Sequence, residues 1–278
     1  PADLPVAAVR AFSLDDAATT EIDDAFSVTR ADGALRVGVH IAAPALGFAP
    51  GSPIDAIARE RLSTVYMPGD KITMLPPGVV ARYTLAEGGV RPALSLYLDV
   101  DPQTLAITGS ESRIEAVPIA VNLRHQDVDH LNDTLAAGHA DPAVPFAADI
   151  ELLYRFAGAL QAARGRSEPT FERKEYAFEV EDGRVRIVER KRGAPLDKLV
   201  SELAILVNAS WGRLLDERGA PALYRAQGPA GKVRMTTVAA GHEGLGVSHY
   251  AWSSSPLRRY VDLVNQRQLI ARVRGEAP

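Results

Sequence analysis

Five acidic residues stand within the ten positions from 15 to 24, between two segments with the composition of β-strands. They are Asp15, Asp16, Glu21, Asp23 and Asp24. Like charges at this spacing repel one another, so a folded loop that gathers them costs free energy unless a cation neutralises them. The sequence has no cysteine and the loop has no histidine, so oxygen ligands for Mg²⁺ or Mn²⁺ are the metal chemistry it favours. A solvated acidic turn is the alternative interpretation.

The net charge of −4 over 278 residues conceals an uneven distribution. Residues 1–60 hold nine acids and four arginines, whereas residues 225–274 hold eight basic residues and two acids. Such a chain can bring a metal and a phosphate together, although solvated faces of opposite charge are the ordinary reading of this asymmetry.

The strongest basic signal is the segment WSSSPLRRY at residues 252–260. Ser255 as N-cap and Pro256 at the first helical position predict a helix that begins there. The unpaired N–H groups of a helix N-terminus attract anions, but two arginines at that end oppose the helix dipole. The placement of Arg258 and Arg259 therefore favours a phosphate nearby.

The remaining pattern predicts an α/β (α+β) fold with a mixed β-sheet surrounded by helices. His40 lies in an apolar strand and is expected to be a hydrogen-bonded core residue. Strands are expected at residues 6–12, 25–29, 35–42, 93–100 and 114–123, with a hairpin at 176–180 and 184–188. Helices are expected at 150–164 and at 195–218, the latter ending before Gly219.

Several features limit where the protein can work. No run approaches the ~18 apolar residues of a membrane helix, and the N-terminus lacks the basic-then-apolar order of a signal peptide. The lack of cysteine rules out disulfides and thiolate chemistry. We expect a cytoplasmic monomer without a membrane partner.

Six short segments in chain order carry a resemblance to a known family: DDAATTEIDDAF at 15–26, VHIA at 39–42, STVYMP at 63–68, MLP at 74–76, LYR at 223–225 and SPLRRY at 255–260. Together they resemble the RNB catalytic domain of the ribonuclease II and ribonuclease R family. The resemblance is colinear and covers nearly the whole chain. It implies a channel for single-stranded RNA and hydrolysis from the 3′ end to nucleoside 5′-monophosphates.

The resemblance also assigns the metal ligands. It implies two Mg²⁺ ions, with Mn²⁺ as a substitute, held by Asp15, Glu21, Asp23 and Asp24. Glu21 departs from the family, which usually has Asp there, and its extra methylene alters the ligand geometry, to which Mg²⁺ is sensitive. Asp23 and Asp24 are also expected to serve catalysis.

Other residues are assigned to phosphate and RNA. Arg258 is expected to be catalytic by binding the phosphate, and Arg259 either contacts the RNA or pairs with Asp262. The resemblance implies RNA contacts for Tyr66, Phe171, Glu202, Arg225 and Arg259. A buried core tyrosine is the alternative for Tyr66, and a solvated helix residue is the alternative for Glu202.

We expect residues 1–278 to form one RNB catalytic domain, C-terminally incomplete, with no OB-type RNA-binding barrel in the chain. The leading hypothesis is a Mg²⁺-dependent 3′-to-5′ exoribonuclease whose partner is single-stranded RNA. A catalytically weakened RNA-binding or regulatory module of the same fold is the main alternative. A hydrolase of another phosphodiester, such as DNA, is a third.

Overall fold

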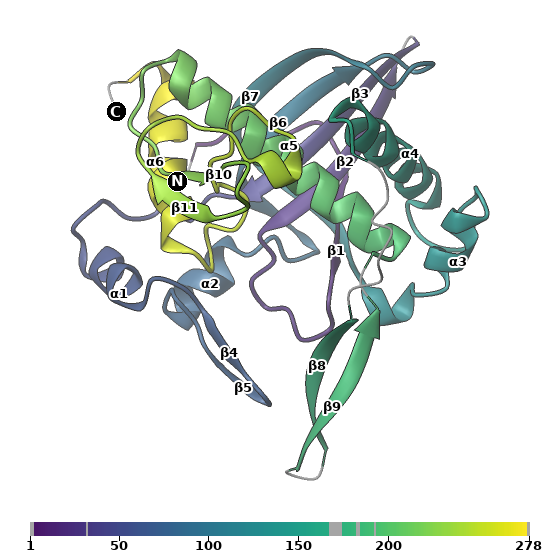
Figure 1. Cartoon of the computed structure of the whole chain (residues 1–278), viewed down its shortest axis with the longest axis horizontal. Helices are drawn as coiled ribbons and strands as arrows, with labels where there is room; N and C mark the ends of the chain where they lie inside the picture. The colour runs from purple at the N-terminus through teal and green to yellow at the C-terminus, as the bar shows by residue number, and fades with distance from the viewer. Residues whose placement is uncertain (1–2, 32, 167–173, 182–183, 192, 277–278) are drawn as a thin grey trace.

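The computed structural model describes residues 3–31, 33–166, 174–181, 184–191 and 193–276, and Figure 1 shows its arrangement. Within those residues, five strands close into a barrel in the order β1–β2–β3–β6–β7. They are β1 (Ala11–Asp15), β2 (Asp24–Ala31), β3 (Ala34–Ala42), β6 (Gly89–Val100) and β7 (Ile107–Arg124). Neighbours are antiparallel except β1 and β7, which run parallel. The mixed sheet is confirmed, and its closure is a further feature.

The first predicted strand lies too early in the chain. Val6 makes only an isolated bridge to Ala116, and the ladder of β1 with β7 runs from Ala11 to Asp15, with an irregular register between Ala11 and Phe12. The acidic residue Asp15 is therefore the last residue of β1, directly opposite Arg124. Because β1 ends at Asp15 and β2 begins at Asp24, the acidic loop has a carboxylate at each of its two junctions with the barrel.

Helices cover the barrel (Figure 1). They are α1 (Pro53–Arg61), α2 (Pro77–Tyr83), α3 (Leu131–Ala136), α4 (Ala147–Ala163), α5 (Pro195–Glu217) and α6 (Tyr260–Arg274). The two helices expected at 150–164 and 195–218 are confirmed as α4 and α5, within three residues at each end. Helix α5 ends where Gly219 takes a positive φ of 60°, a conformation that glycine adopts readily. No described helix is long and apolar enough to span a bilayer.

Two apolar cores hold the helices against the barrel. In one, the buried stripe of α5, including Leu203, Val207 and Trp211, joins α3, α4 and the barrel. The other places α1, α2 and the start of α6 against the opposite part of the barrel. Burial of this apolar surface is the main stabilising contribution to such a fold.

His40 is confirmed as a core residue. Its ring is fully buried, with Nε2 2.9 Å from Ser27 Oγ and Nδ1 2.8 Å from Ser95 Oγ. Burial lowers the pKa of His40 to about 3, because desolvation disfavours the charged imidazolium.

Three two-stranded hairpins lie outside the barrel sheet: β4 (Val65–Met67) with β5 (Asp70–Ile72), β8 (Lys174–Glu181) with β9 (Arg184–Lys191), and β10 (Tyr224–Gln227) with β11 (Val233–Thr236). The β8–β9 hairpin is confirmed, and the other two were not predicted. Figure 1 shows β4–β5 and β8–β9 projecting from the same side of the barrel. They approach each other, since a Cβ at Gly69 would lie 3.0 Å from Val180 Cγ2.

Candidate active site

The acidic loop is fixed through its backbone. The carbonyl of Asp23 accepts a hydrogen bond from Ala42 N at 2.8 Å, and Ile22 N donates to Thr84 Oγ1 at 2.8 Å. Arg124 Nη1 donates to the carbonyls of Asp16 at 3.1 Å and Thr19 at 3.3 Å. The loop is thus held by the barrel rather than free in solvent.

Asp15 ends β1 and Asp24 begins β2, the neighbouring strand of the barrel. Burial raises the pKa of Asp24 to about 7, the charge of Asp15 adds to this shift, and Arg258 and Arg259 oppose it. Burial also raises the pKa of Asp15, although Ser13 Oγ donates to its Oδ2 at 2.6 Å. Burial and mutual repulsion disfavour the ionised forms of these two carboxylates, and a bound cation would favour them.

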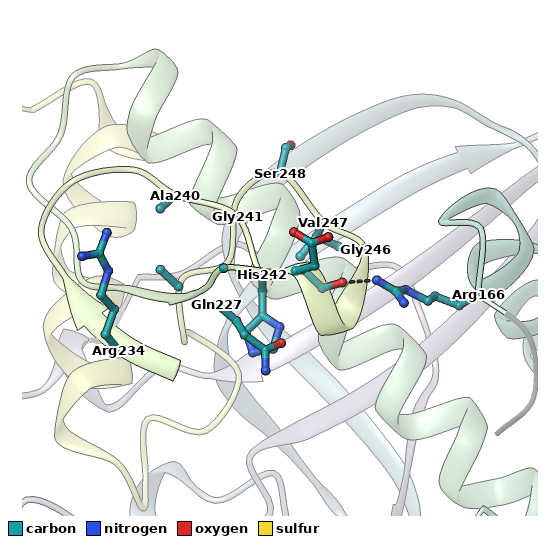
Figure 2. Close-up of a pocket in the computed structure, with 12 residues that line it drawn as sticks. Arg166, Gln227, Arg234, Ala240, Gly241, His242, Gly246, Val247 and Ser248 are labelled. Carbon is teal, nitrogen blue, oxygen red and sulfur yellow. Dashed lines mark hydrogen bonds between the residues drawn. The ribbon is translucent and has the colours of Figure 1, made fainter. Parts of the chain in front are cut away.

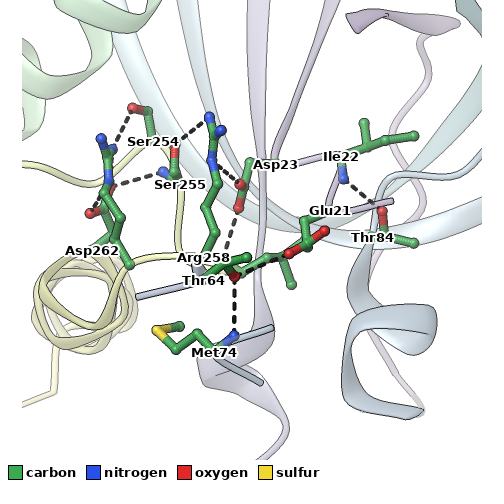
Figure 3. A network of polar contacts seen from close by, with 12 residues as sticks. Glu21, Ile22, Asp23, Thr64, Met74, Thr84, Ser254, Ser255, Arg258 and Asp262 are labelled. Carbon is green, nitrogen blue, oxygen red and sulfur yellow. Dashed lines mark hydrogen bonds and ion pairs between the residues drawn. The ribbon is translucent and has the colours of Figure 1, made fainter. Parts of the chain in front are cut away.

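Asp23 connects this loop to the arginine segment (Figure 3). Its side chain is 1% exposed; Oδ1 accepts Leu257 N at 2.8 Å, and Oδ2 lies 3.1 Å from Arg258 Nε. Oδ2 nevertheless has no aligned hydrogen bond. Burial raises the pKa of Asp23 to about 8 despite the charge of Arg258. This oxygen is therefore a buried acceptor without a proper donor.

Arg258 and Tyr66 complete the cluster. The Arg258 side chain is 45% exposed, and its Nη2 donates to Ser255 Oγ at 3.3 Å. Burial opposes the charge of Arg258, but Asp23, Tyr66 and Asp24 outweigh it and raise the pKa of this guanidinium. Tyr66, on β4, is 58% exposed, so the alternative of a buried core tyrosine is wrong. The cluster thus presents a cation and a phenol ring to solvent.

The predicted helix start at Ser255–Pro256 is wrong, because α6 begins at Tyr260. The amides of Arg258 and Arg259 both turn back to the carbonyl of Ser255, at 3.3 and 3.0 Å, and Leu257 N is taken by Asp23. Arg259 is extended, with φ −135°, and forms a bridge with Ser63. Tertiary bonds therefore hold these residues in a turn ahead of the helix.

Arg259 pairs with Asp262, one of the two alternatives. Its Nε and Nη2 each contact a different oxygen of the fully buried Asp262 carboxylate at 2.7 Å, and Asp262 Oδ1 also accepts Ser255 N at 2.9 Å. The guanidinium carbon lies 4.4 Å from the ring centroid of Trp252. The guanidinium of Arg259 is therefore held by both the Asp262 carboxylate and the Trp252 ring.

Arg225 also lies near this indole, with its guanidinium carbon 5.2 Å from the ring centroid of Trp252. Its Nη1 is 2.7 Å from Nε2 of the buried His242. His242 lines a cavity of about 600 Å³ that also includes Arg166 and Arg234 (Figure 2). Arg166 donates to the carbonyl of Glu243 at its edge.

Neighbouring side chains engage both carboxylate oxygens of Glu21. Its Oε2 is 2.6 Å from Lys71 Nζ and accepts Thr20 Oγ1 at 2.8 Å, while Oε1 accepts Thr64 Oγ1 at 3.1 Å. Burial alone would raise the pKa of Glu21, but these hydrogen bonds and the charge of Lys71 lower it. Among the predicted metal ligands, Glu21 is therefore the one that a lysine and two threonines engage.

Two predicted RNA contacts lie elsewhere. Glu202, on α5, is 5% exposed and lies 2.6 Å from Arg164 Nη1, so the alternative of a solvated residue is wrong. Phe171 falls outside the described residues.

Within the part of the chain that the structure describes, no three His, Asp or Glu side chains are arranged to hold a metal. The donor set still fits one hard cation, because Mg²⁺ is usually held by one or two carboxylates plus water and substrate phosphate. Asp15 and Asp24, whose charges act on each other, supply the carboxylate pair, and Asp23 is a neighbouring carboxylate whose Oδ2 also forms an ion pair with Arg258.

The sequence matches the RNB domain over residues 6–239 and 229–275. The chain belongs to the RNB domain family. An uncharacterized ribonuclease of Synechocystis sp. is 29% identical over 299 residues, which cover 96% of this chain and 43% of the relative. Exoribonuclease 2 of Vibrio parahaemolyticus is 25% identical over 327 residues, covering 96% and 48%. The chain spans about half the length of these curated relatives.

Solved structures confirm the fold. RNase R of Mycoplasma genitalium, in complex with ribose methylated single-stranded RNA, has a TM-score of 0.82 at 17% identity, covering 98% of this RNB chain and 51% of that chain. Yeast Ssd1, a pseudonuclease, has a TM-score of 0.76 at 19% identity, covering 97% and 40%. The same RNB architecture therefore occurs in a nuclease and in a pseudonuclease.

Sequence reasoning missed three residues that organise the site: Lys71, Thr64 and Trp252. Thr64 and Trp252 stand inside or beside segments that carry the family resemblance, which was a usable signal. Lys71 gave none, because its importance depends on a hairpin turning at Gly69 and bringing it over Glu21.

Proposed function

We propose that this chain is a divalent-metal-dependent hydrolytic exoribonuclease that releases nucleoside 5′-monophosphates from the 3′ end of single-stranded RNA. The observation that carries the proposal is the contact of Asp23 with Leu257 and Arg258, which brings an acidic loop and a half-exposed guanidinium to one place. Family membership and relatives named as exoribonucleases support the same activity. Those relatives and the absence of cysteine favour a cytoplasmic setting, and a site built from one chain favours a monomer.

Arg258 would bind the phosphate. Asp23 and Ser255 hold one side of its guanidinium, and its exposed part leaves N–H groups for the non-bridging oxygens of RNA. Such a preorganised cation stabilises the negative charge that develops as water attacks the phosphorus. The P–O3′ bond then breaks, the leaving 3′ oxygen takes a proton, and the released nucleotide keeps the phosphate on its 5′ oxygen.

Asp15, Asp24 and Oδ2 of Asp23 would hold the divalent cation. When bound, such a cation stabilises the charge on a phosphate and lowers the pKa of water at the site. The same carboxylates would keep phosphate and cation at a fixed distance from Arg258, because their backbone is bonded into the barrel.

Tyr66 would position the terminal nucleotide. Its ring is exposed beside Arg258, and aromatic rings stack on any base, which suits a processive enzyme without sequence preference. Arg225 and Arg259, bound to Trp252 and to other side chains, would act mainly by positioning the arginine segment. Glu202 would act through Arg164, and Phe171 remains a predicted stacking residue.

The test uses RNA labelled at the 5′ end and Mg²⁺. We expect the parent chain to shorten single-stranded RNA stepwise and release 5′-mononucleotides, and Asp24→Asn to abolish release while RNA binding persists. Glu60→Gln, an exposed carboxylate on α1, is the matched control and should leave release unchanged. Equal turnover of single-stranded DNA would favour a less selective phosphodiesterase, because RNA selectivity requires contact with the 2′-hydroxyl.

The second candidate is a catalytically weakened RNA-binding module. The engagement of Glu21 by Lys71 favours it, since this predicted metal ligand is already neutralised. A parent chain that binds RNA but releases no nucleotide at any Mg²⁺ or Mn²⁺ concentration would establish this candidate and overturn the exoribonuclease.

A further inference from the structure

An ammonium group is built into the acidic loop. Lys71 Nζ lies 2.6 Å from Glu21 Oε2 and 2.6 Å from Thr20 Oγ1. The Glu21 side chain is 2% exposed and that of Lys71 is 23% exposed. Charged hydrogen bonds that are largely shielded from water are stronger than those at the surface. The position that the family resemblance gives to a metal ligand is thus neutralised by a side chain of the protein itself.

The carboxylate of Glu21 is also satisfied on both oxygens. Thr64 Oγ1 donates to Oε1, and Thr20 and Lys71 both donate to Oε2. By contrast, Asp23 Oδ2 is buried without a hydrogen-bond donor. The carboxylates left for a divalent cation are therefore those of the aspartates, where Arg258 already supplies one positive charge, 3.1 Å from Asp23 Oδ2.

The surroundings fix this pair in place. Thr64 Oγ1 accepts Met74 N at 3.0 Å, and Thr64 N donates to the carbonyl of Arg258 at 3.0 Å (Figure 3). Lys71 is opposite Tyr66 in the β4–β5 ladder, with Nζ 6.0 Å from the tyrosine ring centroid. The threonine, the hairpin and the arginine segment together hold Lys71 over Glu21.

We infer that Lys71 takes the place of a second divalent cation, so that the site binds one metal ion on the side of Asp15, Asp23 and Asp24. The inference rests on the proposed metal-dependent function and concerns how many ions that function uses. One divalent cation, Lys71 and Arg258 balance the four negative charges of the predicted ligands. A second divalent ion at Glu21 would have to displace the ammonium or lie against it, and like charges at that distance repel strongly.

The number of bound ions is measured directly, without activity, by titrating the metal-free chain with Mn²⁺ and recording free Mn²⁺ by electron paramagnetic resonance. We expect one equivalent in the parent chain. Glu21→Gln should keep that equivalent because Glu21 is not a ligand, whereas Asp24→Asn should lose it. Lys71→Met should gain a second equivalent, and adding Glu21→Gln to Lys71→Met should remove it again. Lys232→Met, an exposed lysine, is the control and should bind one.

Each outcome decides between the ideas. Two equivalents in the parent, loss of the single equivalent in Glu21→Gln, or one equivalent in a folded Lys71→Met would overturn the inference and leave the proposed function standing. Absence of Mn²⁺ binding in the parent would overturn the metal-dependent function itself, and the inference with it. If Lys71→Met does not fold, as judged by circular dichroism, the parent and Glu21→Gln still decide the matter.

Discussion

The carboxylate of Asp23 lies against the guanidinium of Arg258, with 3.1 Å between Oδ2 and Nε. Asp23 belongs to the loop between β1 and β2, and Arg258 to the turn before α6, so opposite ends of the sequence meet in one contact. Because Asp23 is buried and Arg258 is half exposed, the carboxylate fixes the base of the guanidinium and leaves its outer face for a ligand.

Arg258→Lys tests this arrangement. Lysine keeps the charge but loses the planar set of N–H groups that reaches Asp23, Ser255 and a phosphate together. We expect the rate of nucleotide release to fall about 100-fold, the scale of losing one preorganised donor. Single-turnover kinetics on labelled RNA measures it. Arg218→Lys, at an exposed position after α5, should release at the parent rate, and an unimpaired Arg258→Lys would refute the role.

Tyr66→Ala and Tyr66→Phe separate stacking from the phenol group. Since the ring is exposed, neither change should alter the melting temperature by more than about 1 °C. Loss of one base stack should weaken binding of single-stranded RNA by roughly tenfold in Tyr66→Ala, whereas Tyr66→Phe should bind like the parent. Fluorescence anisotropy in Ca²⁺ measures affinity without turnover. Equal affinity in all three chains would argue against stacking.

Asp24→Asn should stabilise the metal-free protein. Burial and the neighbouring charge of Asp15 make an ionised Asp24 unfavourable, so a neutral amide at this position removes that electrostatic cost. We expect a gain of about 1–2 kcal/mol, or a melting temperature roughly 2–4 °C higher in chelator. Adding Mn²⁺ should stabilise the parent and not the variant. A lower melting temperature for Asp24→Asn in chelator would show that the carboxylate is structural.

Much of the barrel was readable from the sequence because its strands alternate or run apolar. The strand expected at 35–42 forms β3, one residue longer at its start, and α5 follows its amphipathic stripe from Pro195 to Glu217. His40 was recognised as a core residue because a histidine amid apolar strand residues must find hydrogen-bond partners. The contact of Asp23 with Arg258 was not predicted, because the uneven charge distribution indicated only that the acidic and basic parts of the chain could meet.

Local pattern failed where tertiary bonds override it. Ser255–Pro256 has the sequence of a helix start, yet Asp23 captures Leu257 N and Asp262 captures Ser255 N, so the helix begins later. The pairing of Lys71 with Glu21 was equally hidden, because it joins strand β5 to a loop distant in sequence. Closure of the barrel depends on the parallel pairing of β1 with β7, which no short segment reveals.

Asp262→Asn tests the contact that holds Arg259. The amide keeps an oxygen for Ser255 N but loses the charge that binds both Nε and Nη2 of Arg259. Removing one partner of a buried ion pair costs about 3–5 kcal/mol, and partial exposure of Arg259 lowers this to about 2–3 kcal/mol. Urea unfolding measures it. Asp216→Asn, which removes an exposed contact to His249, should cost less than about 1 kcal/mol.

The buried His40 should make the free energy of unfolding depend on pH. Its pKa is about 3 in the folded protein and near 6.5 when unfolded, so only the unfolded chain takes up a proton as the pH falls below about 6.5. The stability that the neutral, doubly hydrogen-bonded ring contributes is present above that pH and is lost at about 1.4 kcal/mol per pH unit below it.

Buried carboxylates change stability with the opposite sign, so the comparison must be between chains that share them. The free energy of unfolding of the parent minus that of His40→Gln, measured in urea from pH 7.5 to 4.5, removes their contribution. We expect this difference to be constant above pH 7 and to shrink steadily below pH 6.5. His139→Gln, which replaces an exposed histidine, should give a difference independent of pH. A flat difference for His40→Gln would mean that the ring is protonated inside the barrel, with Ser27 and Ser95 both accepting from it.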